Sequence, residues 1–204
     1  MGRILFVRHG QSEWNAEGRW QGQADIPLSD LGRRQAKAAA ASLGTFDVVA
    51  SSTLARAAET AHIVTSELGI GPIVPVPELM ERSAGEWSGL TRVDIERDWP
   101  GYLDNSQHPP GYESDDELWP RLVSGITIVA DMLGPEDEAI VFAHGGLICL
   151  LEDRGGQKRG RIGNLGALWL EVRDGEIIVG ERVCLLYTSP SPRDATLSRM
   201  PSSA

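Results

Sequence analysis

The stretch Ile4-Leu5-Phe6-Val7-Arg8-His9-Gly10-Gln11-Ser12-Glu13-Trp14-Asn15 changes character abruptly after Val7. Its first four residues are large and apolar, which predicts a short buried strand that ends at a charged pair. At such a strand end, the neutral imidazole of His9 could attack phosphorus, and the planar guanidinium of Arg8 could bind phosphate oxygens. Gly10 would let the backbone approach a ligand closely, and Asn15 could donate a hydrogen bond to it. This stretch therefore predicts a phosphate-handling strand end.

Two later apolar segments also end in polar residues. Residues 47–50 lead into Ser51-Ser52 and then Arg56, and residues 139–143 lead into His144-Gly145-Gly146. Because ligands of parallel sheets bind at the carboxyl ends of the strands, we expect these residues to meet the first strand end.

Helical segments separate the strands. We expect a third strand at 73–76, a hairpin from 167–172 and 176–183 around Asp174-Gly175, and helices at 30–43, 54–68, 90–99, 115–133 and 147–153. Strands that alternate with helices predict an α/β fold, a three-layer α/β/α sandwich with a mostly parallel central sheet. Residues 101–112 are predicted to form an irregular insertion.

Four segments in order resemble the histidine phosphatase superfamily, also called the phosphoglycerate mutase-like family. They are residues 5–15, 51–61, 79–89 and 143–146, and the resemblance spans about residues 4 to 183. It implies that Arg56 is a second phosphate-binding arginine, Glu81 the general acid, and His144 the second histidine of the site. It further implies that substrate contacts come from a larger set of residues: Arg8, Gly10, Asn15, Gln21, Gly22, Arg56, His144 and Gly145.

The resemblance implies a reaction that agrees with the chemistry of the residues. His9 would attack in line and become a phosphohistidine, while Arg8, Arg56 and a cationic His144 neutralise the phosphoryl group. Glu81 would protonate the leaving group and then activate water. Neither a metal nor a cofactor is expected, since the four histidines show no ligand spacing.

The resemblance favours hydrolysis over mutase chemistry. Glu81 is followed by Arg82-Ser83-Ala84-Gly85 rather than by the Arg-His-Tyr-Gly string of mutases, and the insertion that could shield a phosphoenzyme is short. We therefore expect a member of the family's phosphatase branch that acts on a small phosphorylated metabolite. A phosphoglycerate mutase-type activity and a silent phosphate-binding domain stay open as alternatives. Substrate selection is assigned to four rim residues of the insertion: Tyr102, Asp104, His108 and Tyr112.

Composition limits the partners and the location. The net charge of −10 disfavours nucleic acid and anionic membranes, so a phosphate would need a local cationic pocket. No apolar run is long enough to span a bilayer and no signal peptide is evident, which predicts a cytoplasmic protein. Cys149 and Cys184 suggest neither a disulfide framework nor a zinc site. A tryptophan-rich surface would permit a homodimer.

The last residues differ in composition from the rest. Residues 184–204 are rich in serine and proline and lack apolar periodicity. We expect one histidine phosphatase domain at 1–183, followed by a non-native or disordered tail at 184–204 that resembles appended vector sequence.

Overall fold

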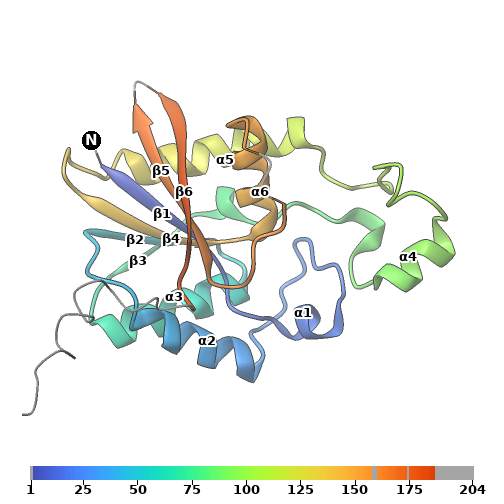
Figure 1. The fold of residues 1–204 in the computed structure, drawn as a ribbon, viewed down its shortest axis with the longest axis horizontal. Helices are drawn as coiled ribbons and strands as arrows, with labels where there is room; N and C mark the ends of the chain where they lie inside the picture. Colours follow the sequence, from blue (N-terminus) through green and yellow to red (C-terminus); the bar gives the residue numbers. More distant parts are fainter. Residues whose placement is uncertain (1, 158–159, 174, 187–204) are drawn as a thin grey trace, which may run out of the picture.

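The centre of the protein is a six-stranded sheet, seen in the computed structural model of Figure 1, which describes residues 2–157, 160–173 and 175–186. The strand order is β3 (Ile73–Pro75), β2 (Val48–Ser51), β4 (Glu138–Ala143), β1 (Arg3–Arg8), β5 (Gly166–Arg173) and β6 (Glu176–Cys184). The first four strands are parallel, whereas β5 and β6 are antiparallel to their neighbours. The prediction of a mostly parallel sheet is therefore only partly correct, because the predicted hairpin joins the same sheet beside β1.

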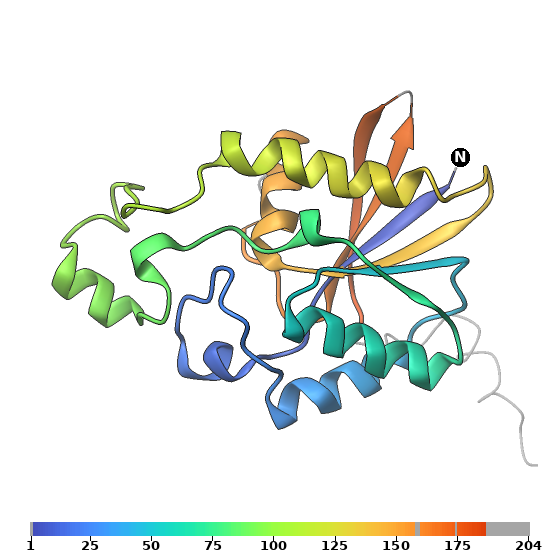
Figure 2. The same ribbon diagram turned by 180° about the vertical axis from the view of Figure 1, so that it is seen from behind.

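Helices cover both faces of this sheet (Figures 1 and 2). One face packs against α2 (Asp30–Ala40) and α3 (Ala55–Leu68), and the other against α5 (Asp115–Ala130) and α6 (Gly145–Arg154). Side chains of β1 alternate between two cores, with Ile4 and Phe6 facing α5 and α6 and with Leu5 and Val7 facing α2 and α3. The three-layer α/β/α prediction is confirmed.

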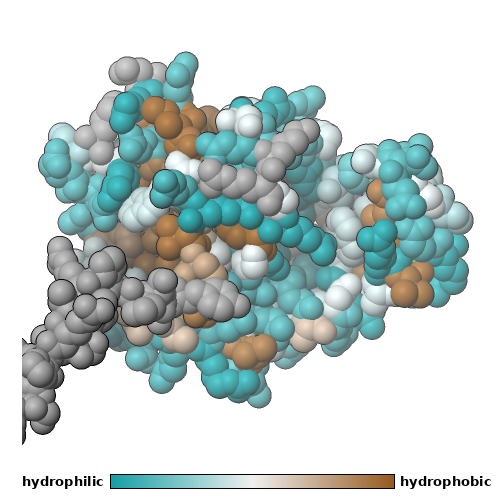
Figure 3. Space-filling model, in the orientation of Figure 1, coloured by the Kyte–Doolittle hydropathy of each residue, from teal (hydrophilic) through white to brown (hydrophobic). Residues whose placement is uncertain are grey.

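Residues 85–114, which include the predicted insertion, form a small lobe beside the sheet. The lobe contains a 3-10 helix, η2 (Gly85–Trp87), and α4 (Arg92–Asp98), built around buried Trp87 and Ile95. Figure 3 shows this lobe standing out from the rest of the molecule, with a mostly hydrophilic surface on the face shown. The lobe has its own apolar cluster, so its packing is separate from the two cores of the sheet.

Capping residues explain where several helices begin and end. Ser29 accepts a hydrogen bond from the Gly32 amide at the start of α2, and Gly69 ends α3 with φ of 68°, as the sequence predicts. The sequence reading misses the short helices α1 (Glu13–Glu17) and η1 (Pro77–Leu79). A reciprocal capping box between Ser12 and Asn15 starts α1 directly after the first strand-end motif.

The described fold continues slightly beyond residue 183. Cys184 ends β6, and Leu185 is buried, with its amide donating to the Leu165 carbonyl. The packing of Leu185 therefore extends the fold past the predicted start of the tail, while the prediction for 187–204 lies outside the described residues.

Two further features bear on the expected partners. No helix in the described ranges is long and apolar enough to cross a membrane. Of the six tryptophans, Trp87 is buried and the others are half-buried, and the expected homodimer stays a prediction.

Candidate active site

Adjacent strands bring the two candidate histidines together. β1 and β4 pair in parallel with Arg8 opposite Ala143, and the His9 amide donates to the Ala143 carbonyl at 3.0 Å. His9 and His144 each follow the end of one of these strands, and their ring centroids lie 5.3 Å apart. The expected meeting of strand ends is thus observed.

His9 is held as a neutral imidazole with a defined tautomer. Its Nδ1 lies 2.6 Å from the Gly10 carbonyl oxygen, which can only accept, so Nδ1 carries the proton and Nε2 keeps its lone pair. Burial, followed by the charges of Arg56 and Arg8, lowers the pKa of His9 well below its usual value. In the free protein Nε2 accepts a hydrogen bond from Arg56 Nε at 3.2 Å. The ring thus presents a nucleophilic nitrogen at neutral pH.

Arg56 on α3 is fully buried beside this nitrogen. Its two terminal nitrogens donate to the carbonyl oxygens of Gly22 and Ala24, each at 2.8 Å. Burial lowers the pKa of Arg56 to about 10, which leaves it charged at neutral pH. None of the described acidic residues forms an ion pair with it, so its charge is available to an anion.

Arg8 supplies a second such charge from the end of β1. Its Nη1 donates to the Ile162 carbonyl, while its buried Nε has no hydrogen-bond partner among the described residues. Burial lowers the pKa of Arg8 from that of a free guanidinium. A methyl group on Gly145 would lie 3.2 Å from Arg8 Cδ, so the glycine lets this side chain lie against the first turn of α6.

Glu81 approaches from the opposite side of the site. Its carboxylate accepts hydrogen bonds from the Arg82 amide at 2.9 Å and from the Gly146 amide at 3.0 Å. A Cβ on Gly146 would collide with this carboxylate. The absence of a side chain at Gly146, which the sequence reading did not assign to the site, therefore allows Glu81 to reach the helix N-terminus.

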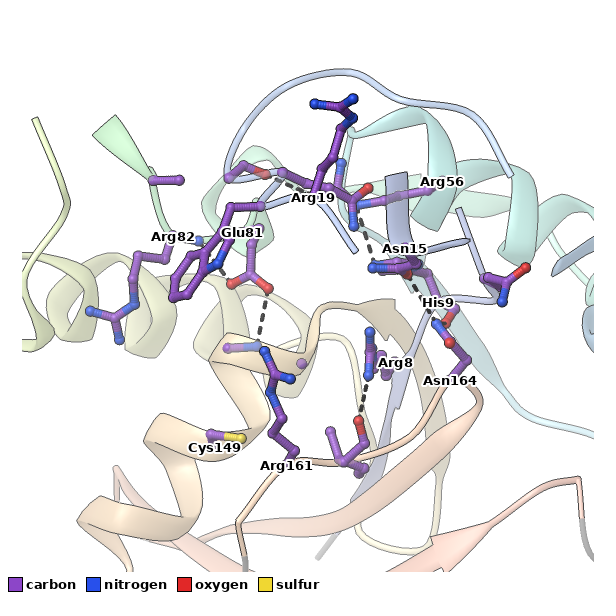
Figure 4. Close-up of a pocket in the computed structure, with 18 of the residues that line it drawn as sticks. Arg8, His9, Asn15, Arg19, Arg56, Glu81, Arg82, Cys149, Arg161 and Asn164 are labelled. Carbon is purple, nitrogen blue, oxygen red and sulfur yellow. Dashed lines mark hydrogen bonds between the residues drawn. The ribbon is translucent and has the colours of Figure 1, made fainter. Parts of the chain in front are cut away.

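These groups surround a pocket of about 450 Å³, shown in Figure 4. Five arginines and one carboxylate are the charged groups of its lining: Arg8, Arg19, Arg56, Arg82, Arg161 and Glu81. The local charge is thus strongly positive although the chain carries −10 overall. An anion such as a phosphate monoester fits this environment.

Most of the residues expected at the site line this pocket. They are Arg8, His9, Asn15, Gln21, Gly22, Arg56, Glu81 and Gly145. Gly10 lies behind the pocket instead, where a Cβ would come within 2.7 Å of the Gly32 carbonyl oxygen and its amide donates to Thr60 Oγ1. The close approach at Gly10 is therefore to α2 and not to the pocket.

His144 also lies behind the pocket, next to His9. Its Nε2 contacts Ser52 Oγ at 2.8 Å, and its exposed fraction is 0%. Burial, then the charge of Arg56 and the proximity of His9, lowers the pKa of His144 well below its usual value. Burial thus opposes the cationic form expected of His144, and that expectation stays a prediction.

Of the four residues expected to select the substrate, one lines the pocket, and their role stays a prediction. Tyr112 lines the pocket and stacks on His108, with ring centroids 3.9 Å apart, but His108 itself is not part of the lining. Tyr102 packs in the cluster around Trp87, and Asp104 lies 3.7 Å from Arg92 on the exposed lobe.

The sequence reading misses several arginines and amides of the lining, above all Arg19, Arg82, Arg161 and Asn164. Arg161 and Asn164 come from the glycine-rich loop after α6, which carries no periodic signal. Asn164 Nδ2 donates to the His9 carbonyl at 3.0 Å and to Asn15 Oδ1 at 3.3 Å. Only its proximity in space to His9 reveals it.

A comparison of the chain with protein families agrees with this geometry. The profile of the histidine phosphatase superfamily (branch 1) matches residues 4–165. The chain belongs to the histidine phosphatase superfamily. The two strand-end motifs, Arg56 and Glu81 of this histidine phosphatase all lie within the matched region.

Curated relatives of this histidine phosphatase include named phosphatases. Glucosyl-3-phosphoglycerate phosphatase of Mycobacterium tuberculosis is 37% identical over 163 residues, 73% of each chain. A metal-independent phosphoserine phosphatase of Arabidopsis thaliana is 36% identical over 155 residues, 71% of this chain and 65% of that protein. Among solved structures, mycobacterial glucosyl-3-phosphoglycerate phosphatase in complex with VO3 superposes with a TM-score of 0.75 at 29% identity, over 87% of this chain and 96% of that one. These relatives place the histidine phosphatase in the phosphatase branch.

Proposed function

We propose that this histidine phosphatase hydrolyses small phosphomonoesters, without a metal, through a phosphohistidine on His9 Nε2. One observation carries the proposal: a ring nitrogen, with the proton held on the other nitrogen, faces a pocket between buried Arg56, half-buried Arg8 and a carboxylate. This arrangement supplies a nucleophile, charge neutralisation and a proton donor within one pocket.

In the first step, His9 Nε2 forms a bond to phosphorus while the ester P–O bond breaks. The departing alkoxide takes a proton from Glu81, and Arg8 and Arg56 bind the phosphoryl oxygens. In the second step, Glu81 takes a proton from water, the oxygen attacks phosphorus, and the P–N bond breaks. Phosphate leaves, and His9 returns to its neutral form.

Two features support hydrolysis rather than transfer to a second substrate. The lobe of residues 85–114 packs around its own cluster beside the sheet, and from it only Tyr112 lines the pocket. Water can therefore reach the phosphohistidine. The curated relatives described above are also named as phosphatases.

A single set of assays tests this function. The protein is incubated with p-nitrophenyl phosphate and with 3-phosphoglycerate, each with excess chelator. We expect phosphate release from wild type and none from His9→Ala, whereas His62→Ala on the exposed side of α3 keeps full turnover. Full turnover in His9→Ala refutes the nucleophile, and loss of turnover with the chelator refutes metal independence. Isomer interconversion without phosphate release identifies a mutase, and silence in both assays identifies a binding domain.

A further inference from the structure

The loop of residues 160–164 forms one wall of the pocket and touches both groups that handle the phosphoryl. Its Ile162 carbonyl accepts from Arg8 Nη1, and its Asn164 side chain donates to the His9 carbonyl. Immediately after the loop, the Leu165 amide donates to the Arg8 carbonyl at 3.0 Å. The orientation of the Arg8 guanidinium therefore depends on where this loop lies.

The far side of the same loop is held by an arginine outside the pocket. Arg182 on β6 donates from Nη2 to the Gly160 carbonyl at 2.6 Å and from Nη1 to the Arg161 carbonyl at 3.3 Å. Arg182 is in turn fixed by Glu152 on α6, which it contacts through Nε at 2.6 Å and also through Nη2. The Glu152 carboxylate is almost fully buried, with an exposed fraction of 1%.

The loop has few other supports. Among the described residues, the backbone hydrogen bonds of 160–164 are confined to the Gly166 amide on the Gly163 carbonyl. The Cys149 thiol also donates to the Gly160 carbonyl at 3.7 Å, and the Ile162 side chain is buried in the core beside α5 and α6. Because the loop is rich in glycine, its conformation costs more entropy to fix than that of a typical chain segment. Side-chain donors therefore define its position together with the buried side chain of Ile162.

We propose that Glu152 and Arg182, neither of which lines the pocket, are positioning residues for phosphate binding. The ion pair holds the carbonyls of Gly160 and Arg161, the loop holds Arg8, and Arg8 binds the phosphoryl group. The same helix, α6, carries Glu152 near its end and the Glu81-binding amide of Gly146 at its start. The Glu152–Arg182 ion pair thus connects the loop that contacts Arg8 to α6, whose first turn binds Glu81.

This inference rests on the proposed function, since it assigns Arg8 to the phosphoryl group. The test replaces both members of the pair by apolar residues of similar size, Glu152→Leu with Arg182→Met, because removal of one partner alone would leave a buried charge. The control is Arg173→Met, which removes an exposed arginine of the same hairpin that pairs with Glu171. Far-ultraviolet circular dichroism and thermal unfolding verify the fold of each variant.

The readouts are the inhibition constant of inorganic phosphate and the separate values of kcat and KM for p-nitrophenyl phosphate. We expect the phosphate inhibition constant to rise and kcat to fall, each by about tenfold, because a small displacement of a binding group is costly in catalysis. The control should match wild type. A folded double variant with wild-type phosphate affinity overturns the proposal and leaves the pair a purely structural role, whereas an inactive wild type refutes the proposed function instead.

A second comparison isolates the route through the loop. Asn164→Ala removes the loop's bond to the His9 carbonyl, and it is combined with the double variant in a thermodynamic cycle. If the pair acts through the loop, the combined loss in kcat/KM is smaller than the product of the separate losses. A combined loss equal to that product would mean that the two sites act independently and would contradict the route through the loop. Should the double variant not fold, Arg182→Lys carries the test, because lysine keeps the charge near Glu152 but lacks the fork that reaches both carbonyls. Unchanged phosphate affinity in Arg182→Lys then overturns the proposal.

Discussion

Acidification from about pH 7.5 to about pH 5.5 should destabilise the protein through His9 and His144, whose burial opposes protonation. In the folded state the pKa of each ring lies well below its ordinary value of 6.5, whereas in the unfolded chain it returns to about that value. The unfolded state therefore binds more protons as the pH falls. The stabilising effect is complete above about pH 6.5 and is lost progressively below it, down to the folded pKa.

The size of the effect follows from these two titrations. Between the two pH values each unfolded imidazole goes from mostly neutral to mostly protonated, while burial opposes protonation of the folded rings. Proton uptake by the unfolded chain therefore sets an upper limit of roughly 3 kcal/mol for the two histidines together, half from each. A typical domain has a free energy of unfolding of about 5–15 kcal/mol, so the loss is large enough to measure.

Urea unfolding followed by tryptophan fluorescence at both pH values is the assay. His9→Asn and His144→Asn should each keep about half of the wild-type loss, and the two together should keep little of it. His62→Asn, on the exposed side of α3, should keep the whole loss. Equal wild-type stability at both pH values, or an equal effect of His62→Asn and His9→Asn, would refute the reasoning.

Three further predictions concern single residues. Arg56→Met should lower kcat/KM by about 10²–10³-fold, as measured by steady-state kinetics. It should change the free energy of unfolding, measured with urea, by less than about 2 kcal/mol. Removal of a buried charge stabilises the fold, and this gain offsets the loss of the hydrogen-bond donors to two carbonyls. Glu81→Gln should lower kcat for an alkyl phosphate by about 10²–10⁴-fold. With p-nitrophenyl phosphate the variant should still release a burst of p-nitrophenol in stopped-flow measurements, because this leaving group needs little protonation. Gly32→Ala should lower the free energy of unfolding by about 1–3 kcal/mol because a Cβ there overlaps the Gln11 carbonyl, whereas Gly44→Ala meets nothing within 4 Å and should have no comparable effect.

The parts of the fold with strong local patterns could be predicted from the sequence. The apolar run before Arg8 and the run before His144 each gave a buried strand with polar residues at its end, and helix caps such as Ser29 marked real boundaries. The position of the hairpin beside β1 could not be predicted, because strand order is set by contacts between distant segments. Short elements such as α1 were missed, since five residues show no full helical period.

The site was predictable where its chemistry is concentrated in motifs. His9, Arg56 and Glu81 follow recognisable strings, but Arg161 and Asn164 belong to an aperiodic loop whose role depends only on its neighbours in space. Charge state is likewise a property of the surroundings. The lowered pKa of His144 results from its burial and from the charges of Arg56 and Arg8, which lie far from it in sequence.

The paired ends of β1 and β4 have a consequence for the lifetime of the site. Because the amide of His9 is bonded to the carbonyl of Ala143 across the central pair of strands, we expect His9, the proposed nucleophile, to lie in the part of the fold that opens last. Amide hydrogen exchange at His9 should therefore require complete unfolding, whereas the lobe around α4 can open alone. Opening of the outer lobe would thus leave the ring of His9 in its place.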